Sequence, residues 1–327
     1  MTESTRFILP DGCRPPSGRH PDAPETPEPY VAPDSLVTAV NLAIYLRRPL
    51  LLEGEAGCGK SRLSRHVAYE LGLPLYEWPV RSTSRAQDGL YTYDSILRLH
   101  DVHLRQLETA AEPQEIPPTA PVEGRRDPQQ PMNYVNFGAL GKAFRLQECP
   151  AVVLIDEIDK ADIDFPNDLL TVLEQPWRFE VREAYEPPVE AKHAPIIIIT
   201  SNKEKGNLPA PFLRRCIYFY IEFPSTLERL KAIVDAHYSL RKARDAVEPP
   251  TAALAKAACA RFLAMRGKGD LYRKPGTSEF LDWLEALRGF QDLPGLMEIL
   301  NSDEANLPYP ELLFKIRDDW WRHAIKL

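Results

Sequence analysis

The chain of 327 residues lacks the features that would place it outside the ordinary globular proteins. No stretch approaches the uninterrupted apolar run that a membrane-spanning helix needs, and the first residues, MTESTRFILPDGCRPP, lack the charged-then-apolar layout of a signal peptide. The five cysteines are scattered, without the close pairs that bind zinc, and a chain of this size does not need disulfides. The sequence therefore predicts a cytoplasmic protein in a reducing compartment.

Positive charge is also in short supply. Lysine and arginine together number 40 against 47 aspartates and glutamates, which gives a formal net charge of −7. Affinity for the phosphate backbone comes mainly from an excess of basic residues, so this balance argues against nucleic acid as a general partner. One local basic cluster remains, which we interpret as a solvated helix face: Arg261, Arg266, Lys268, Arg273 and Lys274.

Composition and periodicity divide the chain into three segments. Residues 1–33 are crowded with proline and polar residues and predict an extended N-terminal arm. Residues 34–222 alternate short apolar runs with amphipathic stretches, which predicts an α/β domain with a central parallel sheet covered by helices on both faces. Residues 223–327 have helical spacing without a convincing strand and predict a smaller all-helical domain.

The pattern within these segments gives individual elements and two inserts. Strands are predicted at 50–53, 75–80, 152–155, 196–199 and 217–221, and helices at 34–48, 59–71 and 165–173. The C-terminal segment has helical spacing at 227–234, 254–265, 280–290 and 312–325. Inserts near 81–133 and at 177–195 interrupt the α/β pattern; the proline-rich part of the first, 111–132, predicts a surface insertion, and the second predicts a hairpin.

A glycine-rich loop follows the first predicted strand. Its sequence, GEAGCGKS, matches G-x-x-x-x-G-K-[ST], in which glycines let backbone N–H groups wrap around phosphate oxygens. A chance glycine-rich turn is disfavoured, because the loop opens an amphipathic helix whose positive end would face the phosphates. Lys60 would reach the β and γ phosphates, and Ser61 would be a ligand of Mg²⁺. The motif predicts a P-loop NTPase that binds ATP and Mg²⁺ through Gly54, Glu55, Ala56, Gly57, Cys58, Gly59, Lys60, Ser61 and Arg62.

Two adjacent carboxylates end a later apolar strand. Asp156 and Glu157 follow the run AVVLI, at the point where a parallel sheet presents its ligand-binding edge. Asp156 would hold Mg²⁺ through water, while Glu157 would polarise the water that attacks the γ phosphate. The alternative is a strand that merely ends in a polar turn, and the P-loop upstream makes that alternative the weaker one.

With these motifs in order, the sequence resembles the AAA+ ATPases. The strand IIIITSN ends in Asn202, at the place of the family's sensor 1 residue, which could hydrogen-bond the attacking water or the γ phosphate. The segment LPAPFLRRCI resembles the part that carries the arginine finger, with Arg215 as first choice and Arg214 as second. A finger that acts on a neighbouring subunit implies a ring. On the residues alone, a turn-forming asparagine and a solvated arginine pair remain the alternatives.

Further motifs resemble the MoxR branch of this family. They are DEIDKA at 156–161, NDLLTVLE at 167–174, the predicted hairpin, and QDGLYTY at 87–93, where the branch has an insert. The resemblance covers about residues 30–290 and implies a hexameric, chaperone-like ATPase acting on a partner protein, either one with a von Willebrand A domain or a metal-dependent enzyme being matured. It also implies that Tyr30 and Val31 lie near the adenine pocket. For Arg81, Tyr91 and Tyr93, substrate contact and ordinary surface packing are equally open.

One position departs from the family pattern. The family has an arginine, sensor 2, at the start of a lid helix, but the corresponding stretch here reads KPGTSEFLD and contains Glu279. A carboxylate cannot donate a hydrogen bond to a phosphate. Arg273 or Lys274 could substitute from the preceding turn.

Two other functions stay open on the sequence. A nucleic-acid-directed motor of a restriction or defence system would show DNA-stimulated turnover. A nucleotide-gated scaffold, in which ATP only assembles a ring, gains support from the missing sensor 2 arginine. It loses support because Lys60, Asp156, Glu157 and Asn202 are all in place, and a phosphate-release assay separates it from an ATPase.

Overall fold

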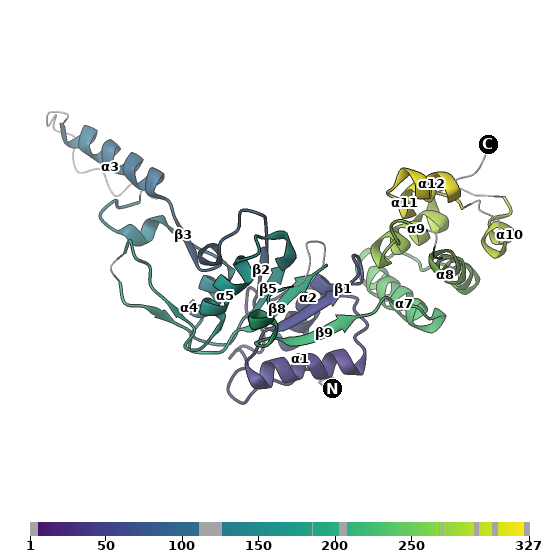
Figure 1. The fold of residues 1–327 in the computed structure, drawn as a ribbon, viewed down its shortest axis with the longest axis horizontal. Helices are drawn as coiled ribbons and strands as arrows, with labels where there is room; N and C mark the ends of the chain where they lie inside the picture. Colours follow the sequence, from purple (N-terminus) through teal and green to yellow (C-terminus); the bar gives the residue numbers. More distant parts are fainter. Residues whose placement is uncertain are drawn as a thin grey trace.

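The computed structural model describes residues 6–110, 126–184, 186–202, 208–267, 269, 271–290, 294–302 and 307–323. Figure 1 shows a central sheet from which two parts extend, a long helix with its neighbouring inserts on one side and the C-terminal helices on the other. Among the predicted features, most of the insertion at 111–132 and Lys268 lie outside the described residues.

A five-stranded parallel sheet forms the centre, with strand order β2-β5-β8-β1-β9. β8 lies between β5 and β1, so it runs beside both the acidic strand and the strand that leads into the glycine-rich loop. The sequence predicted all five strands, because each is a short apolar run between turn residues. Their bounds are β1 (Leu50–Gly54), β2 (Leu75–Pro79), β5 (Val152–Asp156), β8 (Ile196–Ser201) and β9 (Ile217–Ile221).

Helices cover both faces of this sheet. Alternate side chains of a strand point to opposite faces, so Leu154 and Ile198 pack with helices α1 and α2. Their neighbours Ile155 and Ile199 pack with α4, α5 and α6 on the other face. The predicted sandwich of helix, sheet and helix is confirmed. The helices are α1 (Asp34–Leu46), α2 (Lys60–Leu71), α4 (Ala139–Arg145), α5 (Phe165–Leu173) and α6 (Ala210–Leu213).

The N-terminal residues 6–33 contain no helix or strand, yet they lie against the sheet domain. Phe7 is buried in the same cluster as α1 and α2, and its ring meets His66 edge-on with 5.7 Å between ring centroids. The guanidinium of Arg6 donates hydrogen bonds to Ala32 and to Asp34 at the start of α1. Within the described part of the segment that the sequence predicted as an extended arm, these residues therefore anchor the chain to the sheet domain.

The two inserts form small antiparallel pairs beyond the main sheet. β3 (Tyr91–Tyr93) pairs with β4 (Val135–Phe137), and the helix α3 (Ser95–Ala110) extends away from the body between them (Figure 1). The predicted hairpin is confirmed, because β6 (Arg178–Phe179) pairs with β7 (Val189–Glu190). Short 3-10 helices precede β3 and β4, at Ala86–Gly89 and Pro131–Tyr134. A third 3-10 helix, Ile158–Lys160, follows β5.

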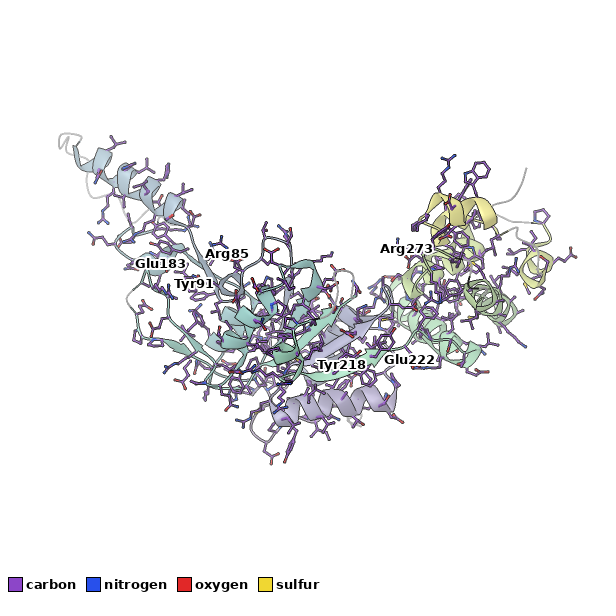
Figure 2. The ribbon with its side chains drawn as sticks, viewed as in Figure 1. Arg85, Tyr91, Glu183, Tyr218, Glu222 and Arg273 are labelled. Atoms are coloured by element: carbon purple, nitrogen blue, oxygen red, sulfur yellow. The ribbon has the colours of Figure 1, made fainter. Side chains whose placement is uncertain are left out.

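Tyr91 joins the two inserts and is only 3% exposed. Its ring stacks on Phe179 with 5.9 Å between centroids, and its hydroxyl donates to the Glu183 carboxylate at 3.1 Å (Figure 2). Packing of one insert on the other therefore occupies Tyr91 and leaves it little surface for a substrate. Tyr93 is half-buried, with its hydroxyl accepting from Arg98 at 2.8 Å, whereas Arg81 is exposed.

The C-terminal helical region has its own buried core, in which Phe262, Phe280 and Trp283 pack together. No helix in the described ranges has both the length and the apolar character needed to cross a membrane. The helices are α7 (Leu227–Asp245), α8 (Ala252–Gly267), α9 (Thr277–Gly289), α10 (Leu296–Asn301), α11 (Pro310–Leu313) and α12 (Arg317–His323).

The single helix predicted at 312–325 is wrong. Pro310 starts the short helix α11, which ends at Leu313, and Phe314 then takes an extended conformation with its side chain in the core. α12 starts at Arg317, and its fully buried Asp319 accepts hydrogen bonds from the backbone N–H groups of Tyr272 and Arg273, both at 3.0 Å. Core packing of Phe314 and these hydrogen bonds of Asp319 accompany the break in a pattern that looked continuous in the sequence.

Candidate nucleotide-binding site

The glycine-rich loop connects β1 to α2 as the sequence predicted. Gly57 and Gly59 have φ values of +75° and +91°, in the left-handed region that favours glycine. Gly59 is also the N-cap of α2, and no side chain caps that helix end. The first N–H groups of α2 therefore point into the loop, where they can bind an anion.

Lys60 and Ser61 begin α2 and make hydrogen bonds to different parts of the site. Lys60 is 6% exposed, and its Nζ donates to the carbonyl oxygens of Gly54 and Glu55, both at 2.9 Å. The Ser61 hydroxyl donates to Asp156 Oδ1 at 2.6 Å. The motif that follows β1 thus meets the acidic end of β5, although 95 residues separate Ser61 from Asp156.

The carboxyl ends of β5 and β8 carry a connected polar network. Asn202 Nδ2 donates to Glu157 Oε1 at 3.1 Å, and Lys160 makes an ion pair with the same carboxylate. The backbone N–H of Asn202 donates to Asp159 Oδ1 at 3.1 Å. Glu157 has a φ of +59°, an uncommon value for a residue other than glycine, so this hydrogen-bonded setting holds a strained backbone.

Thr200 is a member of this network that the sequence reasoning missed. Its side chain is fully buried, and its hydroxyl donates to Asp156 Oδ1 at 2.6 Å while accepting from the Glu157 backbone N–H at 2.8 Å. One hydroxyl therefore fixes both acidic residues to β8. The available signal was a polar residue directly after a run of four isoleucines, two positions before Asn202.

A cavity of about 280 Å³ lies between the loop and the acidic strand ends. It brings together most of the predicted phosphate and metal residues, and it adds Thr200 and Ser278, which the sequence reasoning did not select. The lining is formed by Ala56, Gly57, Gly59, Lys60, Ser61, Arg62, Asp156, Glu157, Thr200, Asn202 and Ser278.

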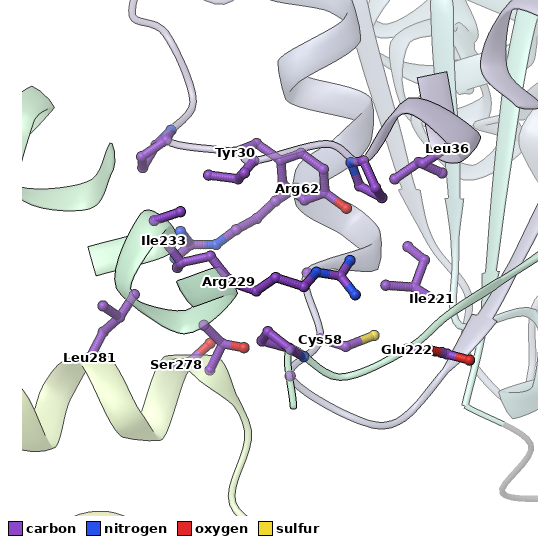
Figure 3. A pocket seen from close by; sticks show the side chains of 18 of the residues that line it. Tyr30, Leu36, Cys58, Arg62, Ile221, Glu222, Arg229, Ile233, Ser278 and Leu281 are labelled. Carbon is purple, nitrogen blue, oxygen red and sulfur yellow. The ribbon is translucent and has the colours of Figure 1, made fainter. Parts of the chain in front are cut away.

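A second, larger cavity of about 620 Å³ opens beside the first and shares Gly57, Gly59, Arg62 and Ser278 with it. Figure 3 shows it enclosed by side chains from the N-terminal segment, β9 and the C-terminal helical region. The predicted residues Tyr30 and Val31 line it. Its other walls include the apolar side chains of Leu36, Ile221, Ile233 and Leu281, together with the cation Arg229.

Tyr30, which is partly buried, and Cys58, which is buried, lie where the N-terminal segment meets the loop. Burial raises the pKa of both the Tyr30 hydroxyl and the Cys58 thiol above their usual values. The Lys60 ammonium, 3.9 Å from Cys58 Sγ, opposes this effect on the thiol pKa without overcoming it. Both groups therefore stay uncharged at neutral pH and add no negative charge beside the anion-binding loop.

Arg214 and Arg215 follow α6 and are exposed, and neither lines either cavity. The Arg215 guanidinium makes an ion pair with Glu174 at the end of α5 and donates to the Pro211 carbonyl at 3.3 Å. Within the described ranges, Arg214 makes no side-chain hydrogen bond or ion pair. The structure thus keeps the two arginines apart from this chain's own loop.

Arg273, Lys274 and Glu279 do not line the phosphate-side cavity either. The Arg273 guanidinium lies 3.5 Å from the Glu279 carboxylate, which also accepts from the Gly276 backbone N–H at 3.1 Å. Arg266, by contrast, is 8% exposed and pairs with Glu55 of the glycine-rich loop. The prediction of a solvated basic face is wrong for Arg266 and for Arg261, because both are buried.

Comparison with known proteins adds to this geometry. The AAA domain family (Cdc48 subfamily) matches residues 124–210. Protein CbbQ of Allochromatium vinosum is 45% identical over 49 residues, a match that covers 15% of this chain and 66% of CbbQ, so the chain spans just under two thirds of that relative.

Two solved structures are also similar, at low sequence identity. NtrX from Brucella abortus, in complex with ADP, aligns with a TM-score of 0.46 and 13% identity over 85% of this chain and 51% of NtrX. A RuvB mutant from Thermotoga maritima aligns with a TM-score of 0.46 and 15% identity over 85% of this chain and 67% of RuvB.

A glycine-rich loop facing an acidic strand end on a parallel sheet, together with the matched AAA domain, defines the chain as a P-loop protein of the AAA+ class. Within that class, the similarity to CbbQ supports the MoxR type. The resemblance that the sequence motifs indicated is confirmed.

Proposed function

We propose that the protein binds ATP with Mg²⁺, hydrolyses ATP, and uses the cycle to remodel a partner protein. The observation that supports this most directly is the convergence of Lys60 and Ser61 with Asp156, Glu157 and Asn202 around one cavity. Basic and acidic side chains share a small site there, and the site opens onto a larger and more apolar cavity. A triphosphate with a divalent cation matches the first cavity, and a nucleoside matches the second.

The residues present fit a magnesium ion. Ser61 Oγ and Asp156 Oδ1 lie 2.6 Å apart, and hydroxyl and carboxylate oxygens are the hard ligands that Mg²⁺ prefers. Asp156 and Ser61 would hold the ion, which when bound neutralises charge on the phosphate oxygens. Lys60 would bind the β and γ phosphates from the other side, assisted by the N–H groups at the start of α2.

Glu157 is the proposed general base. Asn202 and Lys160 both hold its carboxylate, and the Thr200 hydroxyl holds its backbone N–H, so the side chain has a fixed direction toward the cavity. A carboxylate held in this way can accept a proton from a water molecule aligned with the γ phosphate. Asn202 would orient Glu157 and the attacking water together.

The larger cavity is the proposed nucleoside site. Tyr30 and Val31 would contact the base from the N-terminal segment, while Leu281 and Ser278 would contact the nucleotide from the helical region. We therefore assign residues 34–222 to the nucleotide-binding domain, 223–327 to a lid, and 1–33 to an arm that completes the nucleoside site.

A ring, most simply a hexamer, is the proposed assembly. Arg215 and Arg214 are exposed and lie away from this chain's own cavities, a position suited to cations that act on a neighbouring subunit. Arg215 would have to leave Glu174 to do so, whereas Arg214 has no such partner in the described part of the chain. The partner would be a protein in the cytoplasm, and the MoxR resemblance suggests one with a von Willebrand A domain. Nucleic acid is not expected for a chain with net charge −7.

Binding and hydrolysis are tested separately on the purified full chain. We expect a fluorescent ATP analogue to bind with Mg²⁺ present, and phosphate to be released from ATP. Glu157→Gln keeps the size and the hydrogen bond from Asn202 but cannot accept a proton, so kcat should fall by about 10²- to 10⁴-fold with nucleotide affinity retained.

Each contrary outcome points to a different reading. Absence of nucleotide binding by the folded parent would overturn the proposal as a whole. Binding without phosphate release would favour a nucleotide-gated scaffold, and stimulation of phosphate release by DNA would favour a nucleic-acid motor. A Glu157→Gln variant that hydrolyses ATP as fast as the parent would refute the assignment of the base.

A further inference from the structure

The C-terminal helical region contacts the glycine-rich loop directly through one buried arginine. Arg266 is near the C-terminus of α8, and its guanidinium is almost fully enclosed. One nitrogen, Nη1, donates to the Pro275 carbonyl at 2.8 Å, and the other, Nη2, pairs with the Glu55 carboxylate. The guanidinium also lies 3.7 Å from the centre of the Phe223 ring. Both terminal nitrogens of this cation, and the face toward Phe223, are therefore in contact with the protein.

Backbone contacts beside this ion pair also join the helical region to the glycine-rich loop. The backbone N–H of Thr277, at the start of α9, donates to the Gly57 carbonyl at 3.1 Å. A Cβ atom at Gly276 would lie 2.9 Å from Gly57 Cα, so both glycines are needed for this approach. The turn before α9 thus lies directly on the loop that would wrap around the phosphates.

Glu55 connects this junction to the phosphate-binding lysine. Its carboxylate binds Arg266, while its backbone carbonyl accepts from Lys60 Nζ at 2.9 Å. The Glu55 side chain is 43% exposed, whereas Arg266 is 8% exposed. Because a buried guanidinium without a carboxylate is costly, Arg266 constrains where Glu55, and hence the first half of the loop, can lie.

We propose that Arg266 is the cation through which the helical region positions the glycine-rich loop for nucleotide, acting through Glu55. Arg266 is a positioning residue and does not itself contact the phosphates in this arrangement. The sequence suggested Arg273 or Lys274 as the cation that links the helical region to the site. Arg266 has this position instead, because Arg273 is paired with Glu279 and neither Arg273 nor Lys274 lines the phosphate-side cavity. This inference rests on the proposed nucleotide binding and names the residues that couple it to the helical region.

The test uses the full-length protein and compares five single variants, one of them a control, with one double variant. Glu55→Gln removes the charge at the half-exposed partner but keeps an amide oxygen that can accept a hydrogen bond from Arg266. Arg266→Lys and Arg266→Gln alter the other partner. Arg273→Gln tests the alternative cation. Glu248→Gln, which removes the acid of the exposed Lys242–Glu248 pair in the same region, is the matched control. The double variant is Glu55→Gln with Arg266→Gln.

We expect Glu55→Gln to raise KM for MgATP, and the dissociation constant of a fluorescent ATP analogue, by about 10- to 100-fold, with a much smaller change in kcat. Positioning of the loop acts on bound substrate and transition state alike, which is why the effect belongs in KM. Arg266→Lys should retain part of the affinity. The double variant should bind nucleotide no more weakly than whichever single variant has the lower affinity, because both substitutions break the same ion pair.

Three results would overturn the inference while leaving the proposed function intact. They are parent-like affinity in Glu55→Gln, additive losses in the double variant, or an equal loss in Glu248→Gln. A loss of nucleotide affinity in Arg273→Gln, without one in Glu55→Gln, would assign the positioning role to Arg273. If the parent itself binds no nucleotide, the inference fails together with the proposed function, and that result is read from the parent alone. Thermal unfolding of each variant checks that an affinity loss does not come from unfolding. If Arg266→Gln does not fold, the result for Glu55→Gln decides the test.

Discussion

The acidic strand ends and the junction between the loop and the helical region are two ways of building one site. At the strand ends, Asp156, Thr200 and Asn202 come from neighbouring parallel strands and lie close together because their strands end at the same edge. At the junction, Arg266 reaches Glu55 from a position 211 residues away, through a contact that no sequence motif marks. The arrangement at the strand ends depends on strand order, whereas the junction depends on how the helical region packs against the sheet domain.

The two places also differ in how firmly their polar groups are held. Thr200 and the neighbouring Ser201 are almost completely buried, and the two acids are hydrogen-bonded to Thr200 and to Asn202. The junction depends on one ion pair and a backbone hydrogen bond at the rim of two cavities. We therefore expect substitutions at the strand ends to reduce turnover, and substitutions at the junction to reduce nucleotide affinity.

The largest effect is expected at Asp156. Asp156→Asn keeps the shape of the side chain but removes the charge that would hold Mg²⁺ together with Ser61. Turnover should fall on the order of 10³-fold, the size of effect that a bound metal supplies to charge stabilisation. Steady-state phosphate release over a range of MgCl₂ concentrations measures it. An Asp156→Asn variant with parent-like kcat and parent-like Mg²⁺ dependence would remove Asp156 from the metal site.

A smaller effect on turnover is expected at Thr200. Thr200→Val is close in shape but leaves Asp156 Oδ1 and the Glu157 N–H without the shared hydroxyl, a loss of about 1–3 kcal/mol. If the hydroxyl positions both acids, this loss should appear as a decrease in kcat of about 5- to 150-fold, with little change in the affinity for nucleotide. Thr200→Ser keeps the hydroxyl and is the control. Equal kcat values for the valine and serine variants would contradict the positioning role.

The smallest effect is expected inside the helical region, away from both places. Hydrogen bonding from Arg288 lowers the pKa of Glu285 from its usual 4.5 to about 2, assisted by the Tyr238 hydroxyl at 2.6 Å. A carboxyl with a lowered pKa stabilises the fold above its unfolded pKa, and this stability is lost as pH falls toward the folded pKa. Glu285→Gln should therefore cost about 1 kcal/mol at neutral pH.

The pH dependence distinguishes this effect from simple loss of packing. The stability difference between parent and Glu285→Gln, measured by urea unfolding, should shrink between pH 4.5 and about 2. Tyr238→Phe, which leaves the Glu285–Arg288 pair intact, should retain a pH dependence closer to that of the parent. A difference that stays constant with pH would show that the charge on Glu285 does not contribute. Nucleotide affinity should be unchanged in both variants, in contrast to the junction.

Local patterns account for the parts of the fold that the sequence predicted. The five parallel strands, helices α2 and α5, and the hairpin of β6 and β7 each have a periodicity or a turn signal within about fifteen residues. The small pair β3 and β4 and the short helix α10 were not predicted, because none of them has a clear apolar run or turn signal of its own. The predicted helix at 312–325 failed because burial of Phe314 and Asp319 outweighed a continuous helical spacing.

The sequence by itself determined which residues meet at the strand ends. A glycine-rich loop after one strand and acids after another must converge when both strands run parallel in one sheet, since the carboxyl ends of parallel strands share an edge. Only the tertiary structure decided that Thr200 joins the two acids, that Tyr91 is buried between inserts, and that Arg266 rather than Arg273 reaches the loop. These contacts depend on the burial and direction of individual side chains from distant segments, and neither is encoded in spacing along the chain.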